Sequence, residues 1–197
     1  MTRAGQSAAA DTDRQLMERT AAGDHAAFAE LMSRHQDMVF AVALRIMRNR
    51  QAALDATQDT FLTVLRKADR YAGDAEVSTW LYRVATNKCL DHLRSQKRRR
   101  AVPLTDEHDA TDSTADAGLD AIEVRSNISA ALASIPDHYR AAVVLSDVEG
   151  LTIGEMVEVL GIPPGTVKSR IFRGRRMLAD KLEGLRERSR SLAPAAL

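Results

Sequence analysis

Apolar side chains recur every three or four positions over most of this chain, and this period constrains its fold more than any other feature. Such spacing gathers them on one face of an α-helix, whereas the strict alternation of a half-buried strand is scarce. Only five prolines and ten glycines interrupt the 197 residues, and aromatic residues make up 4% of them. The sequence therefore predicts an all-α protein with a mainly aliphatic core.

Three helices are expected between residues 12 and 100. The first carries an apolar stripe from Phe28 to Ile46 and is broken at Asn49 and Arg50. The second spans about residues 52 to 68, and a turn signal follows at residues 71–74. The third begins near Ser78, which is a good N-cap, and ends near residue 98. Residues 1–11 are expected to be disordered.

Residues 152–176 predict a helix-turn-helix. Thr152 and Glu155 form a capping-box pattern, and Gly161 suits the left-handed position after a helix. Prolines 163 and 164 end that helix and suit the start of the next, which carries Lys168, Arg170, Arg173, Arg175 and Arg176. A cationic second helix suits a DNA major groove, although an ordinary hairpin with a solvated basic face remains the alternative. Four helices are expected in the last part of the chain, at 121–133, 136–148, 153–160 and 165–185, and the last two contain the helix-turn-helix.

The net charge of +1 conceals a strong segregation along the chain. Residues 12–100 have a net charge of +5, and residues 121–197 have a net charge of +2. Between them, residues 101–120 contain six acids and neither Lys nor Arg. This middle stretch lacks helical period and apolar surface, so it is predicted to be a flexible acidic linker between two small helical domains.

The segment from Ser78 to Arg100 combines aromatic residues with a dense basic end. Aromatic faces stack on unpaired bases and cations neutralise phosphates, so the pattern favours single-stranded nucleic acid. Asn87 is able to hydrogen-bond a base edge. Most of the Trp80 ring is nevertheless expected in the core, and a solvated helix end is the alternative for the basic run at residues 97–100.

The helix at residues 55–66 presents Asp55 and Asp59 on one face, with Gln58 beside them. No His or Cys joins these carboxylates at ligand spacing, so a docking face for a partner protein is favoured over a metal site. Cys89 is expected to be a small core hydrophobe, and a single cysteine suits a reducing cytoplasm. No signal peptide, membrane-spanning run, phosphate loop or nucleophile motif is present, which predicts a cytoplasmic protein that is not an enzyme and has no cofactor.

Four segments, in this order, resemble the extracytoplasmic-function (ECF) class of bacterial sigma factors. They are AGDHAAF at 22–28, DATQDTFL at 55–62, STWLYRVATN at 78–87 and LGIPPGTVKSRIFRGRRML at 160–178, with the acidic linker before the last. The chain departs from the usual pattern of that family at Leu54, Thr57, Gly154, Pro164 and Gly174. The resemblance covers about residues 12–185.

The resemblance implies a σ2 domain at 12–100, a linker at 101–120, a σ4 helix-turn-helix domain at 121–185 and a tail at 186–197. Docking on the β′ clamp helices of RNA polymerase falls to Asp55, Gln58, Asp59 and Leu62. Recognition and melting of the −10 element fall to Tyr71, Trp80, Tyr82, Arg83, Asn87, Lys88 and Arg94. Recognition of the −35 element falls to Thr166, Lys168, Ser169, Arg170, Phe172 and Arg173.

A sigma factor is the function that the resemblance implies, in a stress or envelope response. The implied partners are core RNA polymerase, through the β′ clamp helices and the β flap, promoter DNA and an anti-sigma factor. The alternative is a ligand-responsive helix-turn-helix regulator, which would bind a palindrome tightly without polymerase. The sequence offers that alternative no obvious dimerisation helix.

Overall fold

A computed structural model describes residues 3–100 and 128–192, which are referred to below as the N-terminal half and the C-terminal half. Both halves are helical, and no strand occurs within those ranges, so the predicted all-α, two-domain fold is confirmed. The predicted acidic linker at residues 101–120 lies outside the described residues. Among the helices of residues 3–100 and 128–192, none combines the length and the apolar content that a membrane span requires.

The N-terminal half consists of α1 (Arg3–Ala21), α2 (His25–Met47), α3 (Arg50–Lys67), the short 3-10 turn η1 (Ala68–Arg70) and α4 (Val77–Arg100). The side chain of Asp24 caps α2 by accepting from two backbone N–H groups. Arg48, at φ 62°, ends α2, and Asn49 caps α3 through the N–H of Ala52. The break predicted at Asn49 and Arg50 is therefore a C-cap followed directly by an N-cap.

This half contains one helix more than the three predicted, and α3 and α4 differ from their predicted bounds by one or two residues at each end. The additional helix, α1, begins at Arg3, where a disordered segment was expected over residues 1–11. Three consecutive alanines at 8–10 have the highest helix propensity of any residue and continue the helix that follows. Helix α4 begins at Val77, one residue before the predicted N-cap, because the N–H of Trp80 bonds the carbonyl of Glu76.

The C-terminal half contains a helical segment at residues 128–134, α6 (Asp137–Val143), the π-helical turn η2 (Val144–Val148), α7 (Ile153–Leu160) and α8 (Pro164–Leu192). Thr152 and Glu155 form the predicted capping box at the start of α7. Gly161 ends α7 at φ 63°, in the left-handed region that glycine enters without a Cβ clash. Helix α8 continues to Leu192, beyond the predicted end at 185 and into the predicted tail.

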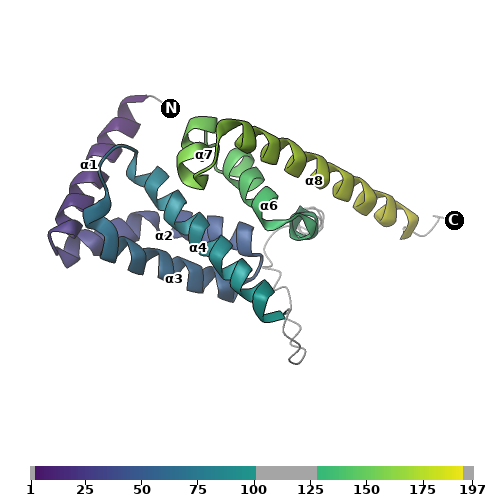
Figure 1. Cartoon of the computed structure of the whole chain (residues 1–197), viewed down its shortest axis with the longest axis horizontal. Coiled ribbons are helices and arrows are strands. Elements are labelled where there is room, and N and C mark those ends of the chain that lie inside the picture. Colours follow the sequence, from purple (N-terminus) through teal and green to yellow (C-terminus); the bar gives the residue numbers. More distant parts are fainter. Residues whose placement is uncertain (1–2, 101–127, 193–197) are drawn as a thin grey trace.

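The two halves share a core rather than being separate bodies. Helix α4 packs against α2 and α3 on one side and against α7 on the other (Figure 1). Val42 and Ile46 of α2 lie in one buried cluster with Ala141 and Val144 of the C-terminal half. Tyr82 of α4 lies against this cluster and also against the core of α7 and α8. The orientation of the C-terminal half is thus set by apolar contacts with α2 and α4.

Candidate polymerase and nucleic-acid interfaces

The outer face of α3 combines exposed leucines with carboxylates. Leu54 and Leu62 are 43% and 40% exposed, two turns apart on the same side of the helix. Asp55 accepts a hydrogen bond from Gln51, and the Oδ2 of Asp59 lies 2.9 Å from Nε2 of His92 on α4. Gln58 is exposed between them. The predicted docking residues therefore form one solvent-facing surface, with apolar side chains that a partner helix can cover.

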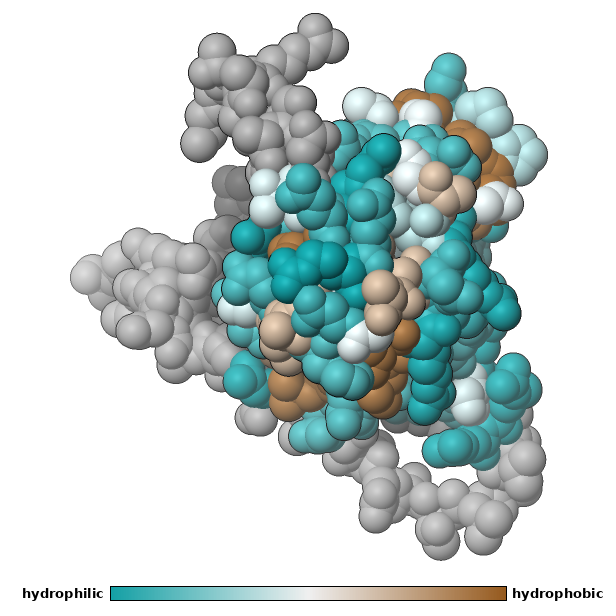
Figure 2. All heavy atoms as spheres, turned by 90° about the vertical axis from the view of Figure 1, so that its left-hand side faces the viewer, coloured by the Kyte–Doolittle hydropathy of each residue, from teal (hydrophilic) through white to brown (hydrophobic). Residues whose placement is uncertain are grey.

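The opposite face of α3 explains why its outer face is free. Ala53, Ala56 and Val64 are fully buried against neighbouring helices, and Phe61 is 5% exposed. These positions follow the helical period, so Leu54, Asp55 and Gln58 between them point outward. Figure 2 views the side of the molecule that carries α1, which is mostly hydrophilic with small separate apolar patches. No extended apolar surface is visible on that side.

The start of α4 is built around Trp80, which is 7% exposed and lies in the core as expected. Its ring meets the ring of Tyr71 edge-on, with 6.0 Å between the centroids. Arg14 of α1 donates to the carbonyl of Gly73 at 2.6 Å and braces the loop between the two aromatic residues. Trp80 therefore supports this loop from beneath, and its predicted part in −10 recognition is limited to the small exposed edge of the ring.

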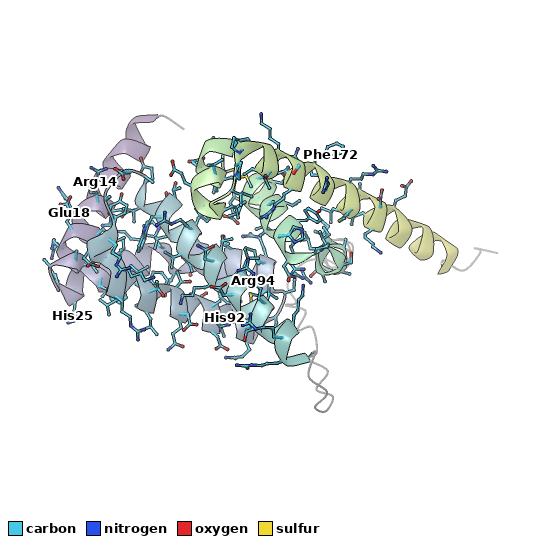
Figure 3. All side chains as sticks on the ribbon, in the orientation of Figure 1. Arg14, Glu18, His25, His92, Arg94 and Phe172 are labelled. Carbon is cyan, nitrogen blue, oxygen red and sulfur yellow. The ribbon has the colours of Figure 1, made fainter. Side chains whose placement is uncertain are left out.

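Arg83, Asn87 and Arg94 are exposed along one side of α4. Their spacing of four and seven residues keeps them on a common face, and Arg94 also pairs with Asp91 at 3.0 Å. Figure 3 marks Arg94 and His92 on this helix. The side chain of Lys88 is half-buried beside that face. The exposed amide of Asn87, flanked by guanidinium groups, is suited to contact a base next to a phosphate chain.

Tyr82 lies on another side of α4 and faces the C-terminal half. Its hydroxyl donates to Oε2 of Glu149 at 3.0 Å, and burial beside this carboxylate raises the pKa of Tyr82. Oε1 of the same carboxylate accepts from Arg45 at 2.9 Å. The structure therefore places Tyr82 between the halves, away from the face that carries Asn87. Arg45 and Glu149 were not predicted, because they lie 104 residues apart in the chain.

Helix α8 divides into a buried side and an open side. Val167 is fully buried, Ile171 is 6% exposed, and Gly174 lies against α6, where a Cβ atom would come within 2.5 Å of Val143. Thr166 and Arg170 are half-buried at the edges of this side. The residues that face solvent among the predicted −35 set are Lys168, Ser169, Phe172 and Arg173.

The open side of α8 has the composition of a groove-binding helix. Phe172 is 69% exposed, which is unusual for an aromatic side chain, and it stands on α8 in Figure 3. Lys168 and Arg173 flank it and supply positive charge. Arg175 is instead held by Asp147, with a shortest N to O distance of 2.6 Å. This arrangement leaves the first turns of α8 free to enter a major groove, with an apolar contact between two cations.

Arg140 is a buried charge that the sequence did not reveal. Its side chain is 5% exposed, donates to the carbonyl of Ile46 in α2 at 2.7 Å, and pairs with Asp137 at 2.8 Å. It also donates to the carbonyls of Leu132 and Ile135. Burial lowers the pKa of Arg140, and these acceptors compensate for its lost hydration. Cys89 is fully buried as predicted, and burial raises the pKa of its thiol to about 12.

Comparisons with known proteins agree with this layout. The family model for Sigma-70 region 2 matches residues 31–99, and the model for Sigma-70, region 4 matches residues 125–178. The ECF RNA polymerase sigma factor SigM of Mycobacterium tuberculosis is 38% identical over 87% of this chain and 85% of its own length. The RNA polymerase sigma-H factor of Pseudomonas aeruginosa is 31% identical over 89% of this chain and 96% of its own length.

Two solved structures share the fold. CnrH, in complex with the cytosolic domain of CnrY, superposes with a TM-score of 0.64 at 25% identity, over 88% of this chain and 98% of that chain. RpoE of Bartonella quintana, in complex with the anti-sigma factor NepR, superposes with a TM-score of 0.62 at 21% identity, over 79% and 96%. The second likeness shows the fold alone.

Proposed function

The chain belongs to the ECF class of RNA polymerase sigma factors, and we propose how its surfaces divide the work of binding core RNA polymerase and directing it to promoters. The N-terminal half corresponds to region 2 and the C-terminal half to region 4. The observation that carries the proposal is the division of α8, which buries Val167 and Ile171 and leaves Lys168, Phe172 and Arg173 open. Helices α3 and α4 are likewise each buried on one side and exposed on the other, and their exposed sides are the other two proposed surfaces.

The exposed face of α3 is proposed to dock on the β′ clamp helices of the polymerase. Leu54 adds a second exposed leucine to the predicted contacts Asp55, Gln58, Asp59 and Leu62. Burying two leucines that stand open in the free chain would favour this complex, while the carboxylates would fix its orientation. The β flap is proposed as a second contact of the polymerase, made by the C-terminal half.

The exposed side of α4 is proposed to bind the −10 element as a single strand. Asn87 supplies donor and acceptor groups for a flipped base, and Arg83 and Arg94 lie near enough along the helix to bind its phosphates. The open side of α8 is proposed to recognise the −35 element as a duplex. Two weak contacts on one protein reinforce each other once polymerase holds both, because the second becomes intramolecular.

A protein partner that holds the chain inactive is also proposed. The similar protein CnrH was solved with the cytosolic domain of CnrY, which supports a partner of this kind. Its expected effect is to prevent the docking of α3 on polymerase or of α4 and α8 on DNA. We place the work of the chain in the cytoplasm, where RNA polymerase and the chromosome are found, and in a stress or envelope response. Neither docking nor DNA recognition requires catalysis by the chain itself.

The test is transcription from a library of genomic promoters by core polymerase, with and without the chain. Leu62→Asp is expected to abolish both polymerase binding and transcription. Asn87→Ala is expected to leave polymerase binding intact while it lowers open-complex formation, because the amide contacts DNA only. Absence of any specific transcript, together with tight binding of a palindrome by the chain alone, would instead identify a conventional regulator.

A further inference from the structure

One polar contact between the halves is made by the carboxylate of Glu149, in the turn between η2 and α7. Each of its oxygens has its own donor from the N-terminal half, Arg45 at 2.9 Å and the Tyr82 hydroxyl at 3.0 Å. The Glu149 side chain is 11% exposed, whereas the side chain of Arg45 is 40% exposed. Guanidinium and hydroxyl donors of this kind also bind the oxygens of a phosphate group.

Two more polar contacts join the halves at the far end of α4 and at the end of α2. Lys97 lies 2.6 Å from the carboxylate of Asp137, and Arg140 donates to the carbonyl of Ile46. Between these points, Ala141 and Val144 are fully buried in a cluster with residues of α2 and α4. The interface therefore has an apolar centre and separate polar contacts around it. This arrangement is typical of a specific interface.

The two ion pairs between the halves have the same polarity. The basic N-terminal half supplies the cations Arg45 and Lys97, and the C-terminal half supplies the acids Glu149 and Asp137. Both cations belong to the stretch with a net charge of +5, which is the stretch expected to attract nucleic acid. Cations of this kind also attract phosphates, so the acids of the C-terminal half would compete with nucleic acid for Arg45 and Lys97.

We propose that the surface made by Arg45 and Tyr82 has two alternative partners, Glu149 within the free chain and the phosphate backbone of promoter DNA once the halves separate. This rests on the proposed binding of DNA to α4, and it adds Arg45 of α2 to the DNA contacts. Tyr82 lies on another side of α4 from Asn87 and is covered by Glu149, so a strand bound along the Asn87 face gains Arg45 and Tyr82 as further contacts only after it displaces Glu149. The closed arrangement leaves the Asn87 face open but withholds the contacts to Arg45 and Tyr82, and it thereby lowers the DNA affinity of the free chain relative to the open chain.

The proposal is tested with the full chain, without polymerase, by two measurements. Small-angle X-ray scattering gives the radius of gyration, and fluorescence anisotropy gives the affinity for a labelled single-stranded DNA 20-mer of randomised sequence. Glu149→Gln is expected to increase the radius of gyration and to tighten DNA binding by roughly tenfold, the change that corresponds to loss of about 1.4 kcal/mol of closing free energy. Glu158→Gln removes the same charge from an exposed position on α7 and is expected to change neither measurement by a comparable amount.

Arg45→Gln separates the two roles of this surface. It breaks the same ion pair and is expected to open the chain, but it also removes a proposed phosphate contact, so its DNA affinity should stay well below that of Glu149→Gln. Equal tightening by both variants would overturn the DNA role of Arg45. An open Glu149→Gln chain with unchanged affinity, or a chain that Glu149→Gln does not open, would overturn the competition.

These measurements do not depend on the promoter function of the chain. A failure of promoter-directed transcription with wild-type chain and core polymerase would refute the proposed function. That failure would not change the radius of gyration of the free chain or its affinity for randomised single-stranded DNA. The two proposals therefore fail on different results.

Discussion

Helices α4 and α8 are both long, both basic and both amphipathic, yet the structure gives them different access to solvent. On α8 the cations Lys168 and Arg173 are open, and its held guanidinium, Arg175, is paired within the same half. On α4 two groups, Tyr82 and Lys97, are engaged by acids of the other half. A basic helix thus shows by its period which side its own domain buries, but not whether another domain covers its flank.

The largest effect is expected from removing Arg140, which joins the C-terminal half to α2 and so helps to keep one side of α4 covered. Arg140→Met is expected to destabilise the chain by about 3 kcal/mol, because it removes a buried charge from its ion pair and leaves carbonyl groups without a donor. The measurement is urea denaturation followed by circular dichroism at neutral pH. Arg176→Ala, an exposed cation on α8, is the matched control and should change stability by less than about 0.5 kcal/mol. Similar losses for both variants would contradict the structural role of Arg140.

The second prediction concerns the buried side of α8, which packs against α6. Gly174→Ala is expected to destabilise the C-terminal half by about 1 to 2 kcal/mol, since a Cβ there meets Val143 at 2.5 Å and overpacking outweighs the gain in helix propensity. Thermal unfolding measures the effect. Gly165→Ala in the same helix has nothing within 4 Å of the added Cβ and should be neutral or slightly stabilising. A stable Gly174→Ala chain would show that α6 and α8 separate easily.

The third prediction compares two exposed cations of α8: Arg173, whose guanidinium donates to the Tyr139 hydroxyl at 3.4 Å, and Arg175, which is paired with the carboxylate of Asp147. Arg173→Ala is expected to reduce the salt dependence of duplex DNA binding, with the slope of log K against log salt falling by about 0.9 for each lost phosphate contact. Arg175→Ala should change that slope less, because Asp147 already engages this guanidinium at 2.6 Å. Affinity for a 30-mer duplex of randomised sequence, measured over a series of salt concentrations, distinguishes the two. A larger change for Arg175→Ala would reverse the assignment of the faces.

The smallest effect is expected from the ion pair within the C-terminal half. The hydrogen bond from Arg175 lowers the pKa of Asp147 in the folded chain, so the stabilisation is complete above the ordinary aspartate pKa of about 3.9 and is lost as the pH falls through the lower folded value. Asp147→Asn should therefore cost less than about 1 kcal/mol at neutral pH and flatten the acid limb of the stability curve. Acid titration of the unfolding free energy, compared with wild type, measures this. An unchanged acid limb would show that the pair contributes nothing measurable.

Most of the local structure could be predicted because its causes lie within four residues. The capping box at Thr152 and the left-handed Gly161 are present as expected, and α8 starts at Pro164, one residue before the predicted position. The same holds for the exposed docking residues of α3, whose positions follow from the helical period. The ring of Trp80 lies in the core as predicted, whereas Tyr82, which the sequence placed on the −10 surface, faces the C-terminal half. Local spacing places a side chain on a helix face, but only packing shows what covers that face.

The sequence by itself determined the helices, the charge segregation and the family. These depend on spacings of three and four residues and on motifs that each occupy one short segment. Only the tertiary structure decided that Arg140 reaches Ile46 across 94 residues and that Glu149 meets Arg45 and Tyr82. The physical reason is that such pairs form when two amphipathic bodies dock, and the docking is fixed by the combined shape of many apolar side chains. No single segment contains that shape, so the residues at the contact have no local mark.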